Sequence, residues 1–304
     1  MHDYGTKREL GPIRQSAVYT HGLDSAELTG DAALAALLDR YPEELIDINE
    51  YRFDERGQVT LRAGTRGDAT GAELLEAVRR ARIWVNLRGI EDQWLELWSR
   101  ATDAFGDIAA AYPSLRAIKR SGQLIISSPG TRVPYHFDPA GVVLFHMRGI
   151  KRMFVYPSDE AHLPEVTMER VVARQTSEEV PYSLEFEADA QVFELHPGEA
   201  LAWPLYAPHR VENVDGLCVS LSMEYQTWES RARTGALYTH AYMRTRGLKP
   251  PAVLAVNGPA LAMKWAMSVP LRRMMVLGNR IAAIPREFVA DPTASVGLRI
   301  QAQD

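Results

Sequence analysis

Between residues 120 and 226, short apolar runs follow one another closely and are separated by Gly, Pro, Asp and Ser. Runs of about four to eight residues bounded by turn-forming residues are typical of strands in a β-sandwich or barrel. This pattern constrains the chain most, because it predicts a mainly β domain at its centre. The runs expected to form strands are 123–127, 141–147, 152–156, 192–195, 200–203, 209–212 and 218–225.

The residues before this β region combine two kinds of pattern. Thr70 and Glu73 are spaced as in a capping box, which marks the first turn of a helix. Helical spacing is found at 31–38, 71–83 and 90–112, and strand-like alternation at 45–48 and 58–61. We therefore expect residues 1–118 to form a mixed α/β flank.

The residues after the β region are expected to be mostly helical. The segment 227–290 has helical patterning, and Pro250 and Pro251 divide it in two. Residues 291–304 are expected to form a loosely held tail. The chain thus divides into three zones: a flank at 1–118, a β domain at 119–226 and a helical segment at 227–304.

The composition excludes several classes of protein. Hydrophobic residues make up 46% of the chain and charged residues 24%, which argues against intrinsic disorder. The formal net charge of −5 argues against a general nucleic-acid binder, which needs a dense basic face. The single cysteine, Cys218, rules out an internal disulfide and a cysteine-based zinc site. The N-terminus has no apolar stretch of the secretory type, so the expected compartment is the cytoplasm.

The apolar segment 251–285 raises the question of a membrane. Lys264, Arg272, Arg273 and Arg280 interrupt it, so no run of about 18 uncharged apolar residues remains for a spanning helix. The composition favours a buried or dimer-forming helical segment, and an interfacial membrane anchor is the alternative.

The triplet His136-Phe137-Asp138 is the first candidate site. In a strand, alternate side chains face the same way, so this spacing places an imidazole and a carboxylate side by side. Both could reach one metal ion at about 2.0–2.2 Å. One such triplet is a weak signal, and a third ligand is needed.

His209 is the best candidate for that third ligand. It follows a turn at 197–199 and a tight loop at 204–208, and it opens the next expected strand. In a sandwich, this return strand can lie beside the strand of His136. Two imidazoles and one carboxylate would leave three positions of an octahedral ion open, which is the facial triad of non-haem Fe(II) oxygenases.

Lys151 is a candidate for binding an acidic co-substrate beside such an ion. It lies fifteen residues after His136, beyond a turn at Gly149, on the next expected strand. The distal carboxylate of 2-oxoglutarate needs a fixed cation inside the barrel, and a lysine ammonium supplies a compact point charge. An exposed strand lysine is the alternative.

These residues lie in stretches that resemble a known family. Residues 131–157, TRVPYHFDPAGVVLFHMRGIKRMFVYP, are similar to the metal-binding half of the JmjC-like cupin oxygenases, which include the asparaginyl hydroxylase acting on hypoxia-inducible factor. Residues 197–214, PGEALAWPLYAPHRVENV, resemble the half that carries the distal histidine. The resemblance covers residues 120–226. It implies a mainly β fold, a double-stranded β-helix (jelly-roll cupin), between the N-terminal α/β flank and the C-terminal helices.

The resemblance also implies roles for individual residues. The catalytic Fe(II) ligands would be His136, Asp138 and His209. Lys151 would bind 2-oxoglutarate, and Ser222 would be a polar residue facing the pocket.

Two positions depart from the family's pattern. Val142 and Val133 stand where many relatives have an asparagine and a hydroxyl residue. The oxoglutarate carboxylates are therefore expected to use other donors. His146 has the same strand parity as the ligands, so it either touches substrate or oxoglutarate or is a core histidine with satisfied hydrogen bonds. The candidate donors are Ser127, Thr131, Tyr135 and Ser222.

The activity that the resemblance implies is oxygenation. With Fe(II), 2-oxoglutarate and O₂, such an enzyme would hydroxylate or demethylate a C–H of a protein or peptide side chain. The alternatives are a small-molecule 2-oxoglutarate oxygenase and a metal-binding cupin without oxoglutarate chemistry. No nucleic-acid partner and no transmembrane segment are expected, and the C-terminal helices are expected to form a homodimer.

Overall fold

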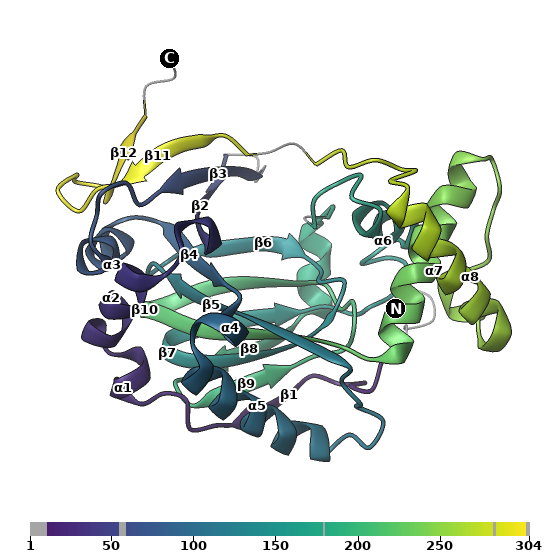
Figure 1. Ribbon diagram of the computed structural model, residues 1–304, viewed down its shortest axis with the longest axis horizontal. Helices are drawn as coiled ribbons and strands as arrows, with labels where there is room; N and C mark the ends of the chain where they lie inside the picture. Colours follow the sequence, from purple (N-terminus) through teal and green to yellow (C-terminus); the bar gives the residue numbers. More distant parts are fainter. Residues whose placement is uncertain (1–10, 55–58, 179, 282–283, 302–304) are drawn as a thin grey trace.

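The computed structural model describes residues 11–54, 59–178, 180–281 and 284–301. Residues 119–226 form the centre of a large sheet, as the punctuated apolar runs predict (Figure 1). The mainly β, jelly-roll architecture is confirmed. The central strands are β5 (Lys119–Ser127), β6 (Arg132–His136), β7 (Gly141–Val155), β8 (Gln191–Leu195), β9 (Glu199–Ala202) and β10 (His209–Gln226).

Two long strands organise this central part. β10 pairs with β5 on one side and with β7 on the other, and its first residues also pair with β6. The first half of β7 pairs with β9 and its second half with β8. β1 (Ala17–Thr20) extends the sheet beyond β9. Each long strand thus changes partners along its length, and this lets the sheet wrap around a central cavity.

The sequence predicted each of these long strands as two short ones. Gly149 lies within β7 at a φ of +81°, and the register of β10 against β7 shifts on both sides of Asp215. A glycine or bulge lets a strand bend and continue, although its sequence looks like a turn. The strands expected at 141–147 and 152–156 therefore belong to the single strand β7, and those expected at 209–212 and 218–225 belong to β10.

The N-terminal flank extends the sheet and packs helices against it. Leu37, Leu74 and Phe105, from three of its helices, lie in the largest hydrophobic core together with residues of the sheet. The capping box of Thr70 and Glu73 is confirmed. The elements are α1 (Ala26–Thr29), α2 (Asp31–Arg40), η1 (Glu43–Leu45), β2 (Ile46–Phe53), β3 (Val59–Thr65), α3 (Gly71–Arg80), β4 (Ile83–Arg88), α4 (Ile90–Gln93) and α5 (Leu95–Ala110).

Two boundaries in this flank differ from expectation. Ile83 begins β4 and does not end the helix expected at 71–83, because the chain leaves the helix at Ala81. The helix expected at 90–112 is interrupted at Trp94, whose backbone (φ −139°, ψ 75°) is not helical. Of the strand expected at 58–61, Gln58 lies outside the described residues, and β3 begins at Val59.

The C-terminal segment first forms helices and then returns to the sheet. α7 (Trp228–Thr245), η3 (Val253–Ala255) and α8 (Gly258–Arg273) pack beside α6 (Glu165–Val172), and η2 (Leu184–Asp189) precedes β8 (Figure 1). β11 (Arg286–Ala290) then pairs in parallel with β3, and β12 (Leu298–Ile300) pairs with β11.

This return corrects two expectations, a helical pattern up to residue 290 and a loose tail from 291. Phe288 and Leu298 are buried in the largest core against the N-terminal flank. Apolar burial against a distant segment therefore fixes these strands, and local patterning could not indicate it.

The sheet crosses both expected domain boundaries. β4 pairs with β5, and β11 pairs with β3, so both flanks share the sheet of the central region. The division into three domains stays a prediction. Within the described residues, no helix combines the length and apolar character needed to cross a membrane.

Candidate metal centre and cavity

Three metal-ligand side chains meet where β6 ends and β10 begins. His136 and His209 are Cα partners across these antiparallel strands, and their ring centroids lie 4.2 Å apart. The Nε2 of His209 is 3.4 Å from Oδ2 of Asp138. One ligand atom from each residue lies within 4.8 Å of the other two.

Asp138 reaches this position in a different way from the one expected. β6 ends at His136, so Asp138 lies in the following loop and not on a strand. Strand alternation therefore does not align the two side chains. The loop turns the carboxylate back toward the histidines.

Backbone carbonyls orient both imidazoles. The Nδ1–H of His136 donates to the carbonyl of Pro134 at 2.8 Å, and that of His209 donates to the carbonyl of Ala207 at 3.2 Å. A carbonyl only accepts, so each Nε2 is left with its lone pair free for a metal. Burial lowers the pKa of His209 to about 4, so this ring is neutral near pH 7.

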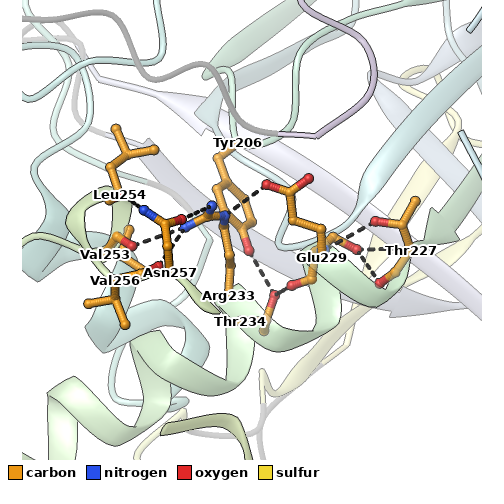
Figure 2. A network of polar contacts seen from close by, with 10 residues as sticks. Tyr206, Thr227, Glu229, Arg233, Thr234, Val253, Leu254, Val256 and Asn257 are labelled. Atoms are coloured by element: carbon orange, nitrogen blue, oxygen red, sulfur yellow. Dashed lines mark hydrogen bonds and ion pairs between the residues drawn. The ribbon is translucent and has the colours of Figure 1, made fainter. Parts of the chain in front are cut away.

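The turn before His209 is held by the C-terminal helices. Tyr206 has a φ of +63°, which is uncommon for a residue with a side chain. Its hydroxyl hydrogen-bonds with Thr234 Oγ1 of α7 at 2.8 Å (Figure 2). Its ring meets Phe137 edge to face. The segments that carry all three ligand residues are therefore braced at α7.

The three side chains open into a cavity of about 440 Å³. Lys151 lines it at 4% exposure, and burial lowers the pKa of its ammonium group. Within the described residues, no carboxylate lies at ion-pair distance from Lys151. A buried ammonium without a counter-charge is costly, so this end of the cavity is suited to an anionic ligand.

Three hydroxyl residues expected beside the co-substrate line the same cavity. These are Ser127, Thr131 and Ser222. The Thr131 hydroxyl is buried and has no hydrogen-bond partner among the described residues, whereas Ser127 Oγ accepts from Asn213 Nδ2 at 2.8 Å. The cavity thus offers a polar wall next to Lys151.

Two other expected residues do not line the cavity. His146 is fully buried, its Nε2–H donates to the Gly149 carbonyl at 2.9 Å, and its Nδ1 accepts from Ser220 Oγ at 3.0 Å. Of the two roles expected for His146, the structure favours a core histidine with satisfied hydrogen bonds over a contact with substrate or oxoglutarate. The hydroxyl of Tyr135 donates to the carbonyl of His162 at 2.9 Å, which removes Tyr135 from the candidate donors.

Sequence reasoning missed several residues of the cavity. Glu178, in the loop after α6, lies near the ligands, and burial with the neighbouring Asp138 raises its pKa to about 7. For Asn213, the sequence offered one signal, which was its place in the run Val211-Glu212-Asn213 of the stretch that resembles the family. The remaining members come from the N-terminal flank, the segment after α6 and the C-terminal segment, without a motif. The missed residues include Tyr51, Leu61, Trp84, Arg174, Ser177, Glu178, Asn213 and Ile281.

The donor set suits a divalent first-row transition metal. Two imidazoles and one carboxylate on one side of an ion leave positions open toward the cavity. Carbonyl bonds to the far nitrogens are the usual support for such ligands. The arrangement can therefore hold a metal and present it to a small anionic molecule.

The cupin-like domain model matches residues 75–229, just over half of the chain. The chain belongs to this cupin-like family. Its matched part includes the three ligand residues, Lys151 and every central strand. No curated protein matches the chain.

Solved structures similar to this cupin-like chain include YcfD from Escherichia coli. One has 17% identity and a TM-score of 0.49, covering 87% of this chain and 64% of that one. Another is described as a ribosomal oxygenase in complex with cobalt and 2-oxoglutarate, at 16% identity, a TM-score of 0.45, and 87% and 63% coverage. The chain therefore spans less than two thirds of the length of YcfD.

Proposed function

We propose that this cupin-like protein is an Fe(II)- and 2-oxoglutarate-dependent oxygenase that hydroxylates a C–H of a protein or peptide side chain. One observation carries the proposal. A facial set of two histidines and an aspartate opens into the cavity that also holds a buried lysine, for which the described residues supply no counter-charge. Binding of a metal alone does not require the cation of Lys151. Binding of a dicarboxylate that chelates the metal does require one, for the second carboxylate.

In this proposal three residues bind Fe(II): His136 at the end of β6, Asp138 in the loop after it and His209 at the start of β10. Bound Fe(II) and 2-oxoglutarate would supply the activation of O₂ that oxidation of an unactivated C–H requires. The role of the protein is to fix the open positions of the ion on the cavity side. The carbonyls that hold both imidazole rings support that role.

The far carboxylate of 2-oxoglutarate would pair with Lys151. Thr131 would donate its unused hydroxyl hydrogen to the same carboxylate, while Ser127 and Ser222 complete the polar wall. Leu144, Met153 and Trp203 line the cavity as well and limit its water. In such a poorly hydrated site, a charged hydrogen bond contributes more than it would in solvent.

The proposed substrate class rests on residues that line the cavity from the N-terminal flank and from the segment after α6. The rings of Tyr51 in β2 and Trp84 in β4 are tilted against each other with their centroids 4.5 Å apart, and both residues line the cavity. Glu178 and Arg174 line it from the segment after α6. These aromatic and charged side chains suit a side chain that enters from a peptide. The alternatives remain a small molecule, or an N-methyl group that is removed after hydroxylation.

Succinate formation tests the proposal. The protein with Fe(II), 2-oxoglutarate and ascorbate should form succinate, and His209→Ala should abolish it. Loss of a group that only supports a ligand costs about 10–100-fold, so loss of a ligand should cost more. His196→Ala, at an exposed histidine, is the matched control and should behave as wild type. No succinate from the wild type under any substrate would favour a metal-binding cupin without oxoglutarate chemistry.

A peptide library read by mass spectrometry tests the substrate class. Gain of one oxygen by a peptide, dependent on Asp138, supports side-chain hydroxylation, and loss of a methyl group indicates demethylation. Oxidation confined to small molecules would overturn the peptide assignment. A cytoplasmic location fits such a substrate and is part of the proposal.

We also propose a homodimer through α8. Met263, Met267 and Met274 are spaced along this helix and its end, and all three are exposed. Exposed methionines at helical spacing suit an adaptable apolar interface. Light scattering should give twice the chain mass for the wild type and a monomer for Met267→Glu. A monomeric wild type would overturn the assembly.

A further inference from the structure

A second group of ligand-type side chains lies between α6 and α7. Glu165 and Glu169 are four residues apart on α6, so they share one face of that helix. His240 of α7 faces them, with its Nδ1 3.6 Å from Oε1 of Glu165 and 3.8 Å from Oε1 of Glu169. One ligand atom from each lies within 4.8 Å of the others, and all three residues are buried.

His240 lacks the partners that a buried histidine normally has. It is 0% exposed, and neither ring nitrogen has a hydrogen-bond partner in the described part of the chain. The two oxygens nearest to Nδ1 lie beyond hydrogen-bond distance. The Nδ1 of His240 therefore faces two carboxylate oxygens without a hydrogen bond to either of them.

The spacing of these atoms fits a bridging ion. Two donors each about 2.1 Å from a tetrahedral ion lie roughly 3.4 Å apart. The separations of 3.6 and 3.8 Å are close to this value. The two distances from Nδ1 to the carboxylate oxygens are therefore compatible with coordination of one ion.

Each carboxylate is already oriented by another group. The backbone N–H of Val253 donates to Oε2 of Glu165 at 2.7 Å, which leaves Oε1 toward His240. Arg244 donates to both oxygens of Glu169, at 2.6 and 3.1 Å. Arg244 thus offsets the charge of the Glu169 carboxylate, whose pKa is raised by burial. Supporting bonds of this kind are typical around metal ligands.

We propose that Glu165, Glu169 and His240 form a structural site for a divalent transition metal of the zinc type, separate from the cavity centre. Two carboxylate oxygens and one imidazole are suitable donors for such an ion, and water completes its coordination. A surface hollow of about 320 Å³ lies beside the cluster and is lined by Glu169 and Arg244 among others.

The site would fasten the helical unit that braces the catalytic turn. Val253, whose N–H holds Glu165, accepts at its carbonyl from Nη1 of Arg233 at 3.0 Å (Figure 2). The next residue on α7, Thr234, bonds with Tyr206 of the turn before His209. The ion would thus join α6 to α7 and η3, which lie together at one end of the molecule (Figure 1).

The test uses the full chain with its first site removed. The variant His136→Ala/Asp138→Ala should retain close to one Zn²⁺ per chain after dialysis, measured by elemental analysis. Added Zn²⁺ should raise its Tm by on the order of 5 °C. Adding His240→Gln should remove the bound zinc and the Tm shift, and adding His196→Gln, at an exposed histidine, should leave both unchanged.

A fourth variant distinguishes the loss of zinc binding from a folding defect. Glu169→Gln keeps an oxygen for Arg244 but loses the charge, so zinc affinity should fall by about 100-fold or more while the far-ultraviolet circular dichroism is unchanged. Absence of zinc from the double variant would overturn the proposal, because the cluster would then not bind the metal. Zinc retained by both His240→Gln and Glu169→Gln would overturn it too, since the metal would lie elsewhere. The result does not depend on oxygenase activity.

Discussion

Replacing Lys151 with Met should change stability and ligand binding in opposite directions. The substitution keeps an unbranched side chain of similar length and removes a charge that is 4% exposed and lacks a described counter-charge. Burying an uncompensated charge is costly, so we expect the free energy of unfolding of the ligand-free protein to rise by about 1–3 kcal/mol.

The pH dependence of this gain has a definite sign. Burial lowers the pKa of Lys151 in the folded state, so the folded wild type holds fewer protons than its unfolded chain. Wild-type stability then rises with pH up to the unfolded lysine pKa of about 10.4. The advantage of Lys151→Met should therefore shrink as the pH approaches that value. Urea denaturation over this pH range measures it.

The same substitution should weaken 2-oxoglutarate binding. A hydrogen bond to a charged group contributes about 1.5–3 kcal/mol, which corresponds to a roughly 10- to 150-fold higher Kd. Calorimetric titration with Mn(II) in place of Fe(II) measures this change. Lys249→Met, at an exposed lysine, is the control and should alter neither quantity. Unchanged affinity in Lys151→Met, or a loss of stability like that of an ordinary core substitution, would refute the reasoning.

Three further predictions concern the framework around the cavity. Hydrogen bonds, mainly from Arg210, lower the pKa of Glu187 to about 2, although burial opposes this shift. Glu187→Gln should therefore lower the free energy of unfolding by about 1 kcal/mol at pH 7. Because the folded pKa is depressed, that cost should vanish as pH falls from about 4.5 to 2 in urea titrations. Thr70→Ala should cost about 1 kcal/mol in unfolding experiments through loss of the capping box, and an unchanged value would argue against that cap. Gly149→Ala should lower Tm clearly, since a Cβ would lie 2.7 Å from Cys218 Sγ at a φ of +81°, and a tolerated substitution would contradict the tight bend.

The central sheet was predictable because its signals are local. Alternating apolar residues and turn residues indicated most strands between 120 and 226, and the ends of those strands placed His136 near His209. The sequence could not show that Gly149 bends a continuing strand instead of ending it. Glycine serves both purposes, and only the pairing with β10 decides between them.

The structure brings the three expected ligand residues together, but partly for a different reason from the one expected, and their metal-binding role stays a prediction. Asp138 lies beyond the end of β6, so loop geometry brings it to the histidines and strand alternation does not. His146 shows the opposite failure. Its parity suggested the cavity, yet Ser220 and the Gly149 carbonyl satisfy both ring nitrogens in the core.

The residues that line the cavity from the flanks were beyond prediction from a single sequence. Trp84 and Tyr51 belong to neighbouring strands of the N-terminal flank, while Glu178 follows α6. Their meeting depends on long-range pairing of β4 with β5 and on the path of a loop. No local pattern encodes either feature. The buried Glu165 and His240 went unnoticed for the same reason, since helix packing alone brings them together.

A crystal structure with Mn(II) and 2-oxoglutarate, with the metal located by anomalous scattering, tests the central claim most directly. We expect one ion bonded to His136, Asp138 and His209 and chelated by the 2-oxo acid, with the distal carboxylate at Lys151. An ion bound without one of these three side chains, or oxoglutarate bound away from Lys151, would contradict it.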